Sequence, residues 1–441
     1  MKIRKYALLS LLILGLGAFL TSCKLTLDPA LDATDVQIQI ELEESLKNAG
    51  LSPVNTQVLL QDRNAGQQWM ATTDASGRVT FPGVVGGVYS VIARRLVQMQ
   101  EYSSYTGIPV DQDVVLIDSL INVNFTASNT IPTRLTLKVN PMGNWVIKQV
   151  YYAGSDTLNG AGIRDQFIEI YNNSNAELYA DSLCVGLLQG VRSRSILSEF
   201  LVAETGQYDW SKSLNIPAAL RDKANTDYVY AHTLVMIPGN GSQYPVKPGE
   251  SIIIAQNAQN HKTGYVGRDG KMIPTKTAGL TVDLSQANFE FYRGIRPSDV
   301  DNPAVPNVTI INANASDLEM APQGLDAVVI FKAPQNLLEW PRIPLPTVQT
   351  ITVNTLYNFQ IPTTYLIDGV ELQPSSTQTY PRKVPVRLDA SYKYVPGGAY
   401  SSQSIIRKTV KTINTRRILA TTANSQTDFG YFERAQPRGF Q

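Results

Sequence analysis

Short segments in which apolar and polar residues alternate recur along this chain, and they constrain its fold more than any other feature. In residues 36–42, VQIQIEL, every second residue is apolar. In residues 165–174, DQFIEIYNNS, Ile168 and Ile170 share one face before the segment enters an Asn/Ser turn. A period of two residues indicates β-strands. We therefore predict an all-β fold.

Residues 72–91, TTDASGRVTFPGVVGGVYSV, combine turn residues with two such strands. Asp74 can accept hydrogen bonds from nearby backbone N–H groups, and Gly77 can adopt a positive φ angle, so the two favour a tight turn. The whole segment resembles a hairpin of the small prealbumin-like β-sandwiches of bacterial surface proteins, such as the carboxypeptidase-regulatory-like and collagen-adhesin B-type repeats. That resemblance implies a small N-terminal β-sandwich over residues 36–128 and says nothing about function.

Three segments of the remaining chain resemble the lamin-tail type of immunoglobulin-like sandwich. They are FIEIYNNS at 167–174, PGESIIIAQNA at 248–258 and AVVIFK at 327–332. In such sandwiches the first of these motifs forms the second strand. The resemblance implies a larger lamin-tail-like β domain with long insertions over residues 129–441.

Further motifs extend the resemblance over nearly all of the chain that follows the signal sequence. They stand in the order IPGNG 237–241, VDLSQANFEFY 282–292, Arg407-Lys408, TTANSQTDF 421–429 and QPR 436–438. With them the chain resembles an uncharacterised family of Bacteroidota lipoproteins, domain of unknown function 4876. Members of that family are often encoded near TonB-dependent outer-membrane receptors, which implies a role in uptake or at the cell surface. The chain departs from the family where Thr421 stands in place of an expected aspartate, so a carboxylate is missing at that turn.

The N-terminal residues have the pattern of a lipoprotein signal peptide. Three basic residues precede an uncharged apolar run that ends near Leu20 and is too short to span a membrane as a helix. Leu20-Thr-Ser-Cys23 then resembles a bacterial lipobox, so residues 1–22 are predicted to be a signal peptide and Cys23 the lipidated residue. Residues 23–35 would form the lipidated tether. We expect the protein to be held at the outer membrane by lipid, with the cell surface favoured over the periplasmic face.

The charge balance and the cysteine content limit the partners and the cross-links that the chain could have. The chain has 38 Lys and Arg against 37 Asp and Glu, and removal of the three basic residues of the signal leaves 35 against 37, a net charge of −2. Such a balance gives no reason to expect a nucleic acid as a partner. Of the two cysteines, lipidation of Cys23 would leave Cys184 unpaired, and its apolar surroundings predict a buried thiol.

Few residues have the spacing that catalysis or metal binding needs. His232 and His261 have no His or Cys neighbours at metal-ligand spacing, so we predict no metal and no cofactor. Asp165, Glu169 and Glu290 are the obvious acidic residues of the motifs, but such residues beside turns usually accept backbone hydrogen bonds. A pair of carboxylates for glycoside hydrolysis is a spatial arrangement that stays open at this point. We predict that the protein is not an enzyme.

Aromatic residues are crowded into an irregular stretch between two strand motifs. On a strand, Tyr228 and Tyr230 would share one face, and exposed rings can stack on sugars or anchor a protein partner. The alternative is that the rings cover the edge of the core. The predicted ligand or partner site consists of Tyr208, Trp210, Tyr228, Tyr230 and Tyr244.

These observations favour one function over two others. The first is an outer-membrane, surface-facing binding lipoprotein that works beside a TonB-dependent receptor in nutrient capture. The second is a structural or adhesive surface protein with the sandwiches as spacers. The third is a glycan-active enzyme, which an acidic pair converging in a cleft would favour.

Overall fold

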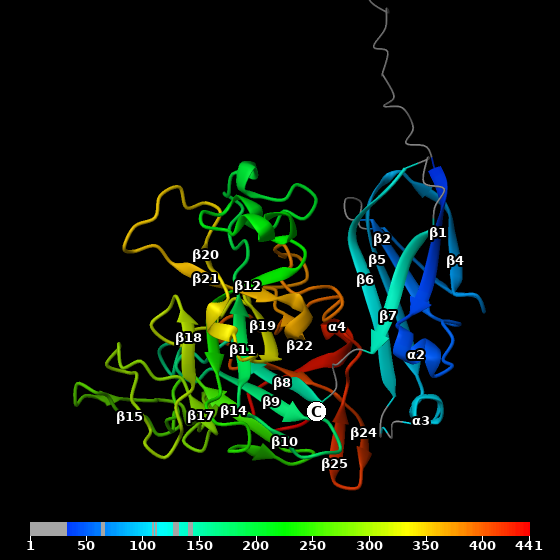
Figure 1. Ribbon diagram of the computed structural model, residues 1–441. Helices are drawn as coiled ribbons and strands as arrows, with labels where there is room; N and C mark the ends of the chain where they lie inside the picture. Colours follow the sequence, from blue (N-terminus) through cyan, green and yellow to red (C-terminus); the bar gives the residue numbers. More distant parts are fainter. Residues whose placement is uncertain (1–32, 63–66, 108–109, 111–112, 127–131, 140–143) are drawn as a thin grey trace, which may run out of the picture.

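Two strand-rich modules lie side by side in the protein (Figure 1). The computed structural model describes residues 33–62, 67–107, 110, 113–126, 132–139 and 144–441. The predicted all-β fold, a small N-terminal sandwich followed by a larger β domain, is confirmed. The signal peptide and the residues around Cys23 lie outside the described part. No helix within the described part has both the length and the apolar character that crossing a membrane requires.

The N-terminal module is a seven-stranded sheet in the order β3-β2-β5-β6-β7-β1-β4, folded over a common core. The alternation in the sequence explains its packing, because Val36, Ile38 and Ile40 of β1 all point inward and are 3% exposed or less. Its elements are β1 Ala33–Leu42, α2 Glu44–Asn48, β2 Gln57–Asp62, β3 Gln68–Thr72, β4 Arg78–Val85, β5 Gly87–Val97, α3 Met99–Thr106, β6 Val114–Phe125 and β7 Thr133–Val139.

The turn predicted before β4 forms as the sequence indicates. Asp74 Oδ1 accepts hydrogen bonds from the backbone N–H groups of Ser76 at 2.8 Å and Arg78 at 2.9 Å. Gly77 has a φ of +78°, and a Cβ atom there would lie 2.5 Å from the carbonyl oxygen of Ile40. Glycine is therefore required at this position by both backbone conformation and close approach.

The first module extends further along the chain than residue 128. Strand β7 pairs with β1 in parallel, with Ile40 opposite Leu135, and with β6 in antiparallel fashion, with Leu116 opposite Val139. These pairings place residues 133–139 in the N-terminal sheet. The structure thus puts the boundary between the modules after Val139.

The second module is a sandwich of two sheets with several long insertions. One sheet has the order β20-β21-β12-β11-β19-β22, with β18 also paired to β12, and the other has the order β17-β14-β9-β8-β23-β26. The strands of these sheets are β8 Trp145–Tyr151, β9 Phe167–Asn172, β11 Leu183–Leu188, β12 Tyr228–Met236, β14 Ser251–Ala255, β17 Phe289–Glu290, β18 Thr309–Ala313, β19 Ala327–Lys332, β20 Arg342–Pro344, β21 Tyr357–Pro362, β22 Leu366–Glu371, β23 Ser404–Arg407 and β26 Phe429–Phe432.

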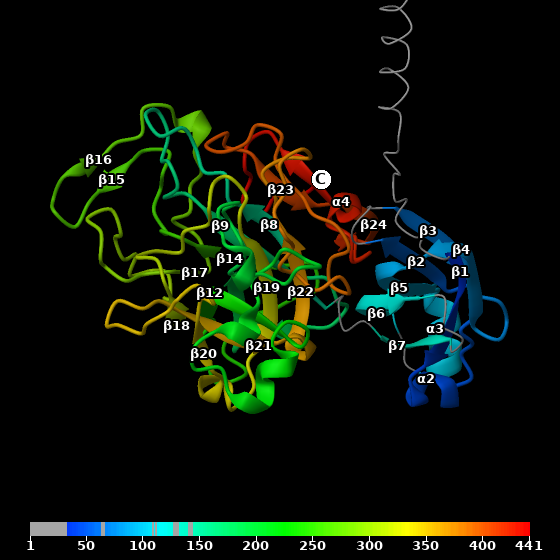
Figure 2. The ribbon, with the colours of Figure 1, turned by 90° about the horizontal axis from the view of Figure 1, so that it is seen from above.

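Short elements in the insertions complete this module, and Figure 2 shows how far some of them extend from the sandwich. Three pairs of short strands form separate two-stranded sheets. The remaining elements are β10 Leu178–Tyr179, β13 Pro245–Val246, β15 Tyr265–Val266, β16 Met272–Ile273, β24 Thr409–Ile413, β25 Arg416–Leu419, η1 Ser198–Phe200, η2 Trp210–Lys212, η3 Ala218–Lys223, η4 Ala278–Leu280, η5 Leu337–Glu339, η6 Thr363–Tyr365 and α4 Ser425–Asp428.

One hydrophobic cluster joins the two modules. Ile92, Val115 and Ile117 face away from the core of the first module and pack into a cluster that also contains Cys184 and Leu188 of β11. Each of these five side chains is 7% exposed or less. The prediction that Cys184 is a buried thiol is confirmed, and burial raises the pKa of that thiol well above its usual range.

Candidate functional site

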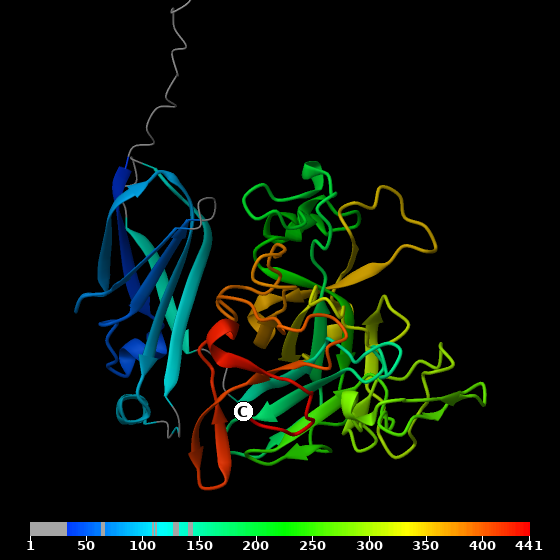
Figure 3. The ribbon, with the colours of Figure 1, turned by 180° about the vertical axis from the view of Figure 1, so that it is seen from behind.

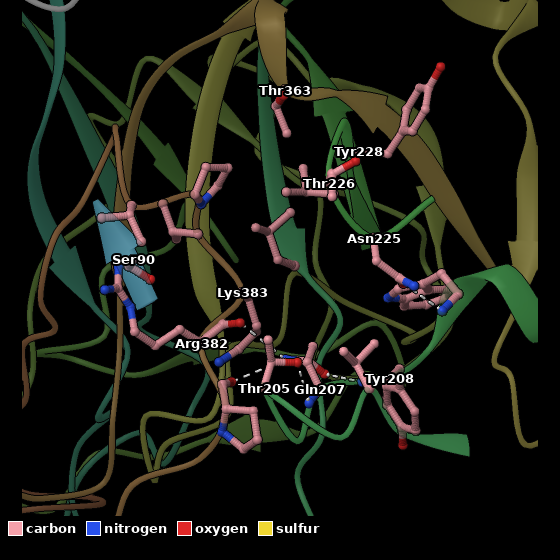
Figure 4. A pocket seen from close by; sticks show the side chains of 18 of the residues that line it. Ser90, Thr205, Gln207, Tyr208, Asn225, Thr226, Tyr228, Thr363, Arg382 and Lys383 are labelled. Atoms are coloured by element: carbon pink, nitrogen blue, oxygen red, sulfur yellow. Dashed lines mark hydrogen bonds between the residues drawn. The ribbon is translucent and has the colours of Figure 1, made fainter. Parts of the chain in front are cut away.

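A pocket of about 700 Å³ lies at the junction of the two modules. The N-terminal module contributes residues of β2, β5 and β6, and the second module contributes the end of β11, the start of β12, the connection between these two strands, Thr363 and residues 380–387. Figure 4 shows polar side chains from these segments around the cavity. The lining includes Gln61, Asp62, Ser90, Ser119 and Leu120 on one side, and Gln189, Thr205, Gln207, Tyr208, Trp210, Asn225, Thr226, Asp227, Tyr228, Tyr230, Thr363, Tyr380 and 381–387 on the other.

Gln207 joins the β11–β12 connection to the segment that contains residues 380–387. Its Oε1 accepts hydrogen bonds from the backbone N–H groups of Val191 at 2.8 Å and Tyr208 at 2.9 Å. Its Nε2 donates to the carbonyl oxygens of Pro381 at 3.1 Å and Arg382 at 3.3 Å. Because all four bonds go to backbone atoms, this side chain fixes the shape of the pocket and is not free to bind a ligand with the same atoms.

The cationic side chains of the pocket are held by acceptors of the protein itself. Lys383 Nζ donates to Glu371 Oε1 at 2.6 Å, and both side chains are almost fully buried. Arg387 donates to the carbonyl oxygen of Thr363. Arg382 donates to a backbone carbonyl through Nη2, while its Nε is buried without a hydrogen-bond partner in the described residues.

Asp118 of β6 faces Arg387 across the junction of the modules. Burial raises the pKa of the Asp118 carboxyl, and hydrogen bonds from the backbone N–H groups of Thr136 and Ser119 oppose that rise. Asp62 and Asp227 add two carboxylates to the lining. Positive and negative groups are therefore present together, and the pocket has no strong excess of either charge.

Four of the five predicted aromatic residues line this pocket, but three of them are chiefly packing groups. Trp210 and Tyr230 stack on each other with ring centroids 3.7 Å apart and an interplanar angle of 11°. The Tyr230 hydroxyl donates to the carbonyl oxygen of Ala224 at 2.9 Å. Tyr208, Trp210 and Tyr230 are 6%, 4% and 2% exposed, whereas Tyr228 is half-buried. The stacked pair therefore presents little surface to a ligand.

The fifth predicted aromatic residue is elsewhere. Tyr244 packs edge-on against Phe289 with ring centroids 4.9 Å apart, beside the core of the sandwich. It lines a separate cavity of about 200 Å³. Its backbone N–H donates to Asp181 Oδ2 at 2.8 Å. The structure therefore brings together Tyr208, Trp210, Tyr228 and Tyr230 and leaves Tyr244 outside the group.

The acidic residues of the motifs have separate partners and do not line the pocket. Glu169 Oε1 pairs with Lys148 Nζ at 2.8 Å. Asp165 Oδ2 accepts hydrogen bonds from the Tyr151 and Ser155 hydroxyls at 3.2 Å and 3.1 Å. Glu290 accepts hydrogen bonds from two backbone N–H groups. Burial raises the pKa values of Asp165 and Glu290 to about 7.

Both histidines are buried and hydrogen-bonded within the second module. His232 Nε2 lies 3.0 Å from Asp326 Oδ1, and Arg192 pairs with the same carboxylate. His261 Nε2 lies 3.1 Å from the carbonyl oxygen of Asn257, and burial lowers its pKa to about 4. Within the described residues no group of three or more His, Cys, Asp or Glu side chains has the geometry to hold a metal ion.

Sequence reasoning did not identify residues 380–387, YPRKVPVR, as part of the site. This segment contains three cations and two prolines, and such density in a loop is a signal that the sequence does carry. The contribution of Ser90 and Ser119 has no local signal, because it depends on how the first module packs against the second. The polar character of the pocket was therefore not predicted.

Comparisons with known proteins agree with the fold. Residues 247–437 match the model of the family described as "Protein of unknown function (DUF4876)". The chain is also similar to the crystal structure of a DUF4876 family protein from Bacteroides thetaiotaomicron VPI-5482, with 22% identity and a TM-score of 0.50 over 90% of this chain and 94% of that one. The predicted resemblance to this uncharacterised Bacteroidota family is confirmed, and no catalytic family is indicated.

A second solved structure is similar only at a low level. It is described as "a putative adhesin" from Bacteroides ovatus ATCC 8483, with 8% identity and a TM-score of 0.18 over 75% of this chain and 83% of that one. A TM-score this low carries no argument about fold or function. The search of curated proteins found no match.

Proposed function

We propose that the protein is a lipid-anchored binding protein that captures a ligand in the pocket between its two modules. Residues 247–437 of the chain match the uncharacterised family DUF4876. The observation that carries the proposal is the pocket itself. Its volume of about 700 Å³ lies within the usual range of ligand sites, which is roughly 300–1,000 Å³. Junctions between domains are also a preferred place for such sites.

The polar groups of the pocket favour an uncharged ligand rich in hydroxyl groups. Lys383 already has a carboxylate partner, and Arg387 faces Asp118, so an anionic ligand would gain little from either. Ser119, Thr205 and Asn225 on the pocket wall carry hydroxyl and amide groups that can exchange hydrogen bonds with a hydroxyl-rich ligand. Tyr228, which is half-buried, offers an apolar surface beside these polar groups. A short neutral oligosaccharide has both kinds of surface.

The remaining parts of this function come from the sequence. Lipidation at Cys23 would anchor the protein to the outer membrane, with the cell surface as the favoured side. The family resemblance implies a partner among the TonB-dependent receptors, and a binding protein beside such a receptor would deliver nutrients to it. Binding is favoured over catalysis because Asp165, Glu169 and Glu290 each bond to their own partners away from the pocket.

A variant that fills the pocket tests the binding role. Ser119 is half-buried on the pocket wall of the N-terminal module, so Ser119→Trp should fill part of the cavity. Because Ser119 pairs with Ile92 of the cluster between the modules, thermal melting would check that this cluster stays packed in the variant. Purified protein would be titrated with neutral oligosaccharides of two to four sugars and with carboxylated counterparts. We expect a neutral sugar to bind and the variant to weaken it at least ~10-fold, which is about 1.4 kcal/mol.

The matched control is Thr80→Trp, an equal change at an exposed position of β4 away from the pocket, which should leave affinity unchanged. Equal binding by both variants would place the sugar elsewhere, and failure of every sugar to bind would refute the ligand class. Cys23→Ser tests the anchor separately, because that variant should be lost from the membrane fraction.

A further inference from the structure

The loop between β20 and β21, residues 345–356, exposes apolar side chains to an unusual degree. Val353 is 100% exposed, Leu356 58% and Ile351 38%. Scattered single apolar residues are common on protein surfaces, but three within six residues at the end of one loop form a contiguous feature. This apolar loop projects from the second module (Figure 1).

The tip of the loop is an ordered turn. The backbone N–H of Thr355 donates to the carbonyl oxygen of Thr352 at 3.1 Å, and the N–H of Thr352 donates to Thr355 Oγ1 at 2.8 Å. Val353 and Asn354 are the two central residues of this turn. Turn centres usually carry Gly, Pro, Asn, Asp or Ser, because these residues suit the conformation and the contact with water. A valine at the centre of this turn indicates that the turn contacts something other than water.

The loop also lacks charge. No Asp, Glu, Lys or Arg occurs between Arg342 and Asp368, although charged residues make up 17% of the whole chain. Solvent-exposed loops and edges normally carry charges, which keep them from associating. An uncharged, apolar tip suits the boundary between lipid head groups and acyl chains, where charges would have to be desolvated.

The position of the apolar loop relative to the N-terminus indicates which surface the loop faces. Nine residues, 24–32, separate Cys23 from Ala33, and nine residues of chain span at most about 32 Å. The start of β1 and the apolar loop lie at the same end of the molecule in Figures 1 and 3. Val85, which pairs with Ala33, adds a further apolar side chain there and is 45% exposed.

We propose that the apolar loop inserts Ile351, Val353 and Leu356 into the lipid surface that carries the Cys23 anchor. This inference rests on the lipid anchoring in the proposed function. A lipid on a short chain tethers the protein but leaves its orientation free. The second contact fixes that orientation, because the start of β1 and the loop then lie on one membrane plane, with the β24–β25 hairpin at the far end.

The test places a fluorophore at the loop tip of the lipidated full chain. Val353→Cys would be labelled with an environment-sensitive dye, since Cys184 is fully buried and Cys23 carries the lipid. The control is Val410→Cys, a valine that is 61% exposed. It belongs to β24, a strand that lies at the opposite end of the molecule (Figure 1). Both proteins would be reconstituted in vesicles of phosphatidylethanolamine and phosphatidylglycerol.

We expect the Val353 label to shift to shorter wavelength, to brighten severalfold and to be quenched by spin-labelled lipid, while the Val410 label remains in water. Equal behaviour of the two labels would overturn the inference while leaving the anchor intact, provided that the protein floats with the vesicles. A shift that needs no lipid and follows protein concentration would instead show self-association and overturn it. Failure to float would refute the anchor and the inference together, whereas sugar binding in the pocket would be unaffected.

Discussion

At the scale of single residues, the second module contains ion pairs with almost no exposure to water. Arg407 is one of the largest fully buried side chains, and its Nε donates to the carbonyl oxygen of Ile147 at 2.7 Å. Its Nη2 donates to Asp368 Oδ2 at 2.5 Å. Lys148 and Glu169 form a second pair of this kind. Such pairs contribute little net stability, but removal of one partner leaves a buried charge and is costly.

Asp165 gives a prediction about pH. Its carboxyl is fully buried, and burial raises its pKa from 3.8 to about 7. The folded protein therefore binds a proton at this site between about pH 4 and 7 that the unfolded chain releases, so this group makes the protein less stable as pH rises through that window. Asp165→Asn should remove a pH-dependent loss of up to ~4 kcal/mol, at 1.36 kcal/mol per pKa unit.

Urea unfolding at pH 4 and pH 8 measures this effect. The wild type should lose more stability between the two values than the variant, and the Asp165 contribution is the difference between the two losses. Glu290 and Asp317 also have pKa values raised by burial to about 7, so part of the decline should remain in the variant. An identical pH dependence in both proteins would show that the Asp165 carboxyl does not hold its proton in the folded state.

At the scale of elements, the alternation of apolar and polar residues predicted where strands form better than it predicted which strands pair with each other. Strands β1 and β9 form where residues 36–42 and 165–174 indicated them. The parallel pairing of β1 with β7 was not predicted, because it joins segments almost a hundred residues apart and no local pattern marks it. The aromatic stretch was recognised as a cluster, but the sequence could not show that Trp210 and Tyr230 stack on each other.

The stacked pair yields a prediction that separates packing from binding. Trp210 belongs to a small cluster with Tyr208, Ile216 and Tyr230, so Trp210→Ala should lower the free energy of unfolding by roughly 3–5 kcal/mol. Tyr228→Ala removes a half-buried ring and should cost less stability while weakening sugar binding. Thermal melting and titration of both variants provide the comparison. If Trp210→Ala kept its melting temperature and lost only binding, the packing role assigned to Trp210 would be wrong.

At the scale of the whole molecule, the pocket exists only because the modules are packed against each other. The sequence indicated two modules, but their contact depends on the outward faces of β5 and β6, which a strand pattern marks only as half-exposed. Ile92, Val115 and Ile117 are buried by the second module. This explains why the aromatic wall of the pocket could be identified from the sequence while the wall made by Ser90 and Ser119 could not.

The contact predicts that the two modules unfold together. In the alternating pattern of β6, Leu116 packs in the core of the first module and Ile117 packs against the second. The double variant Val115→Ser/Ile117→Ser should therefore spare the first core and weaken only the contact between modules. We expect one calorimetric transition in the wild type and two in the variant, together with weaker sugar binding, because the pocket needs both walls.

Leu96→Ser, at a position of β5 that is 55% exposed, should preserve the single transition. Two transitions in the wild type itself would show that the cluster does not couple the modules, and the pocket would then open and close with their relative motion.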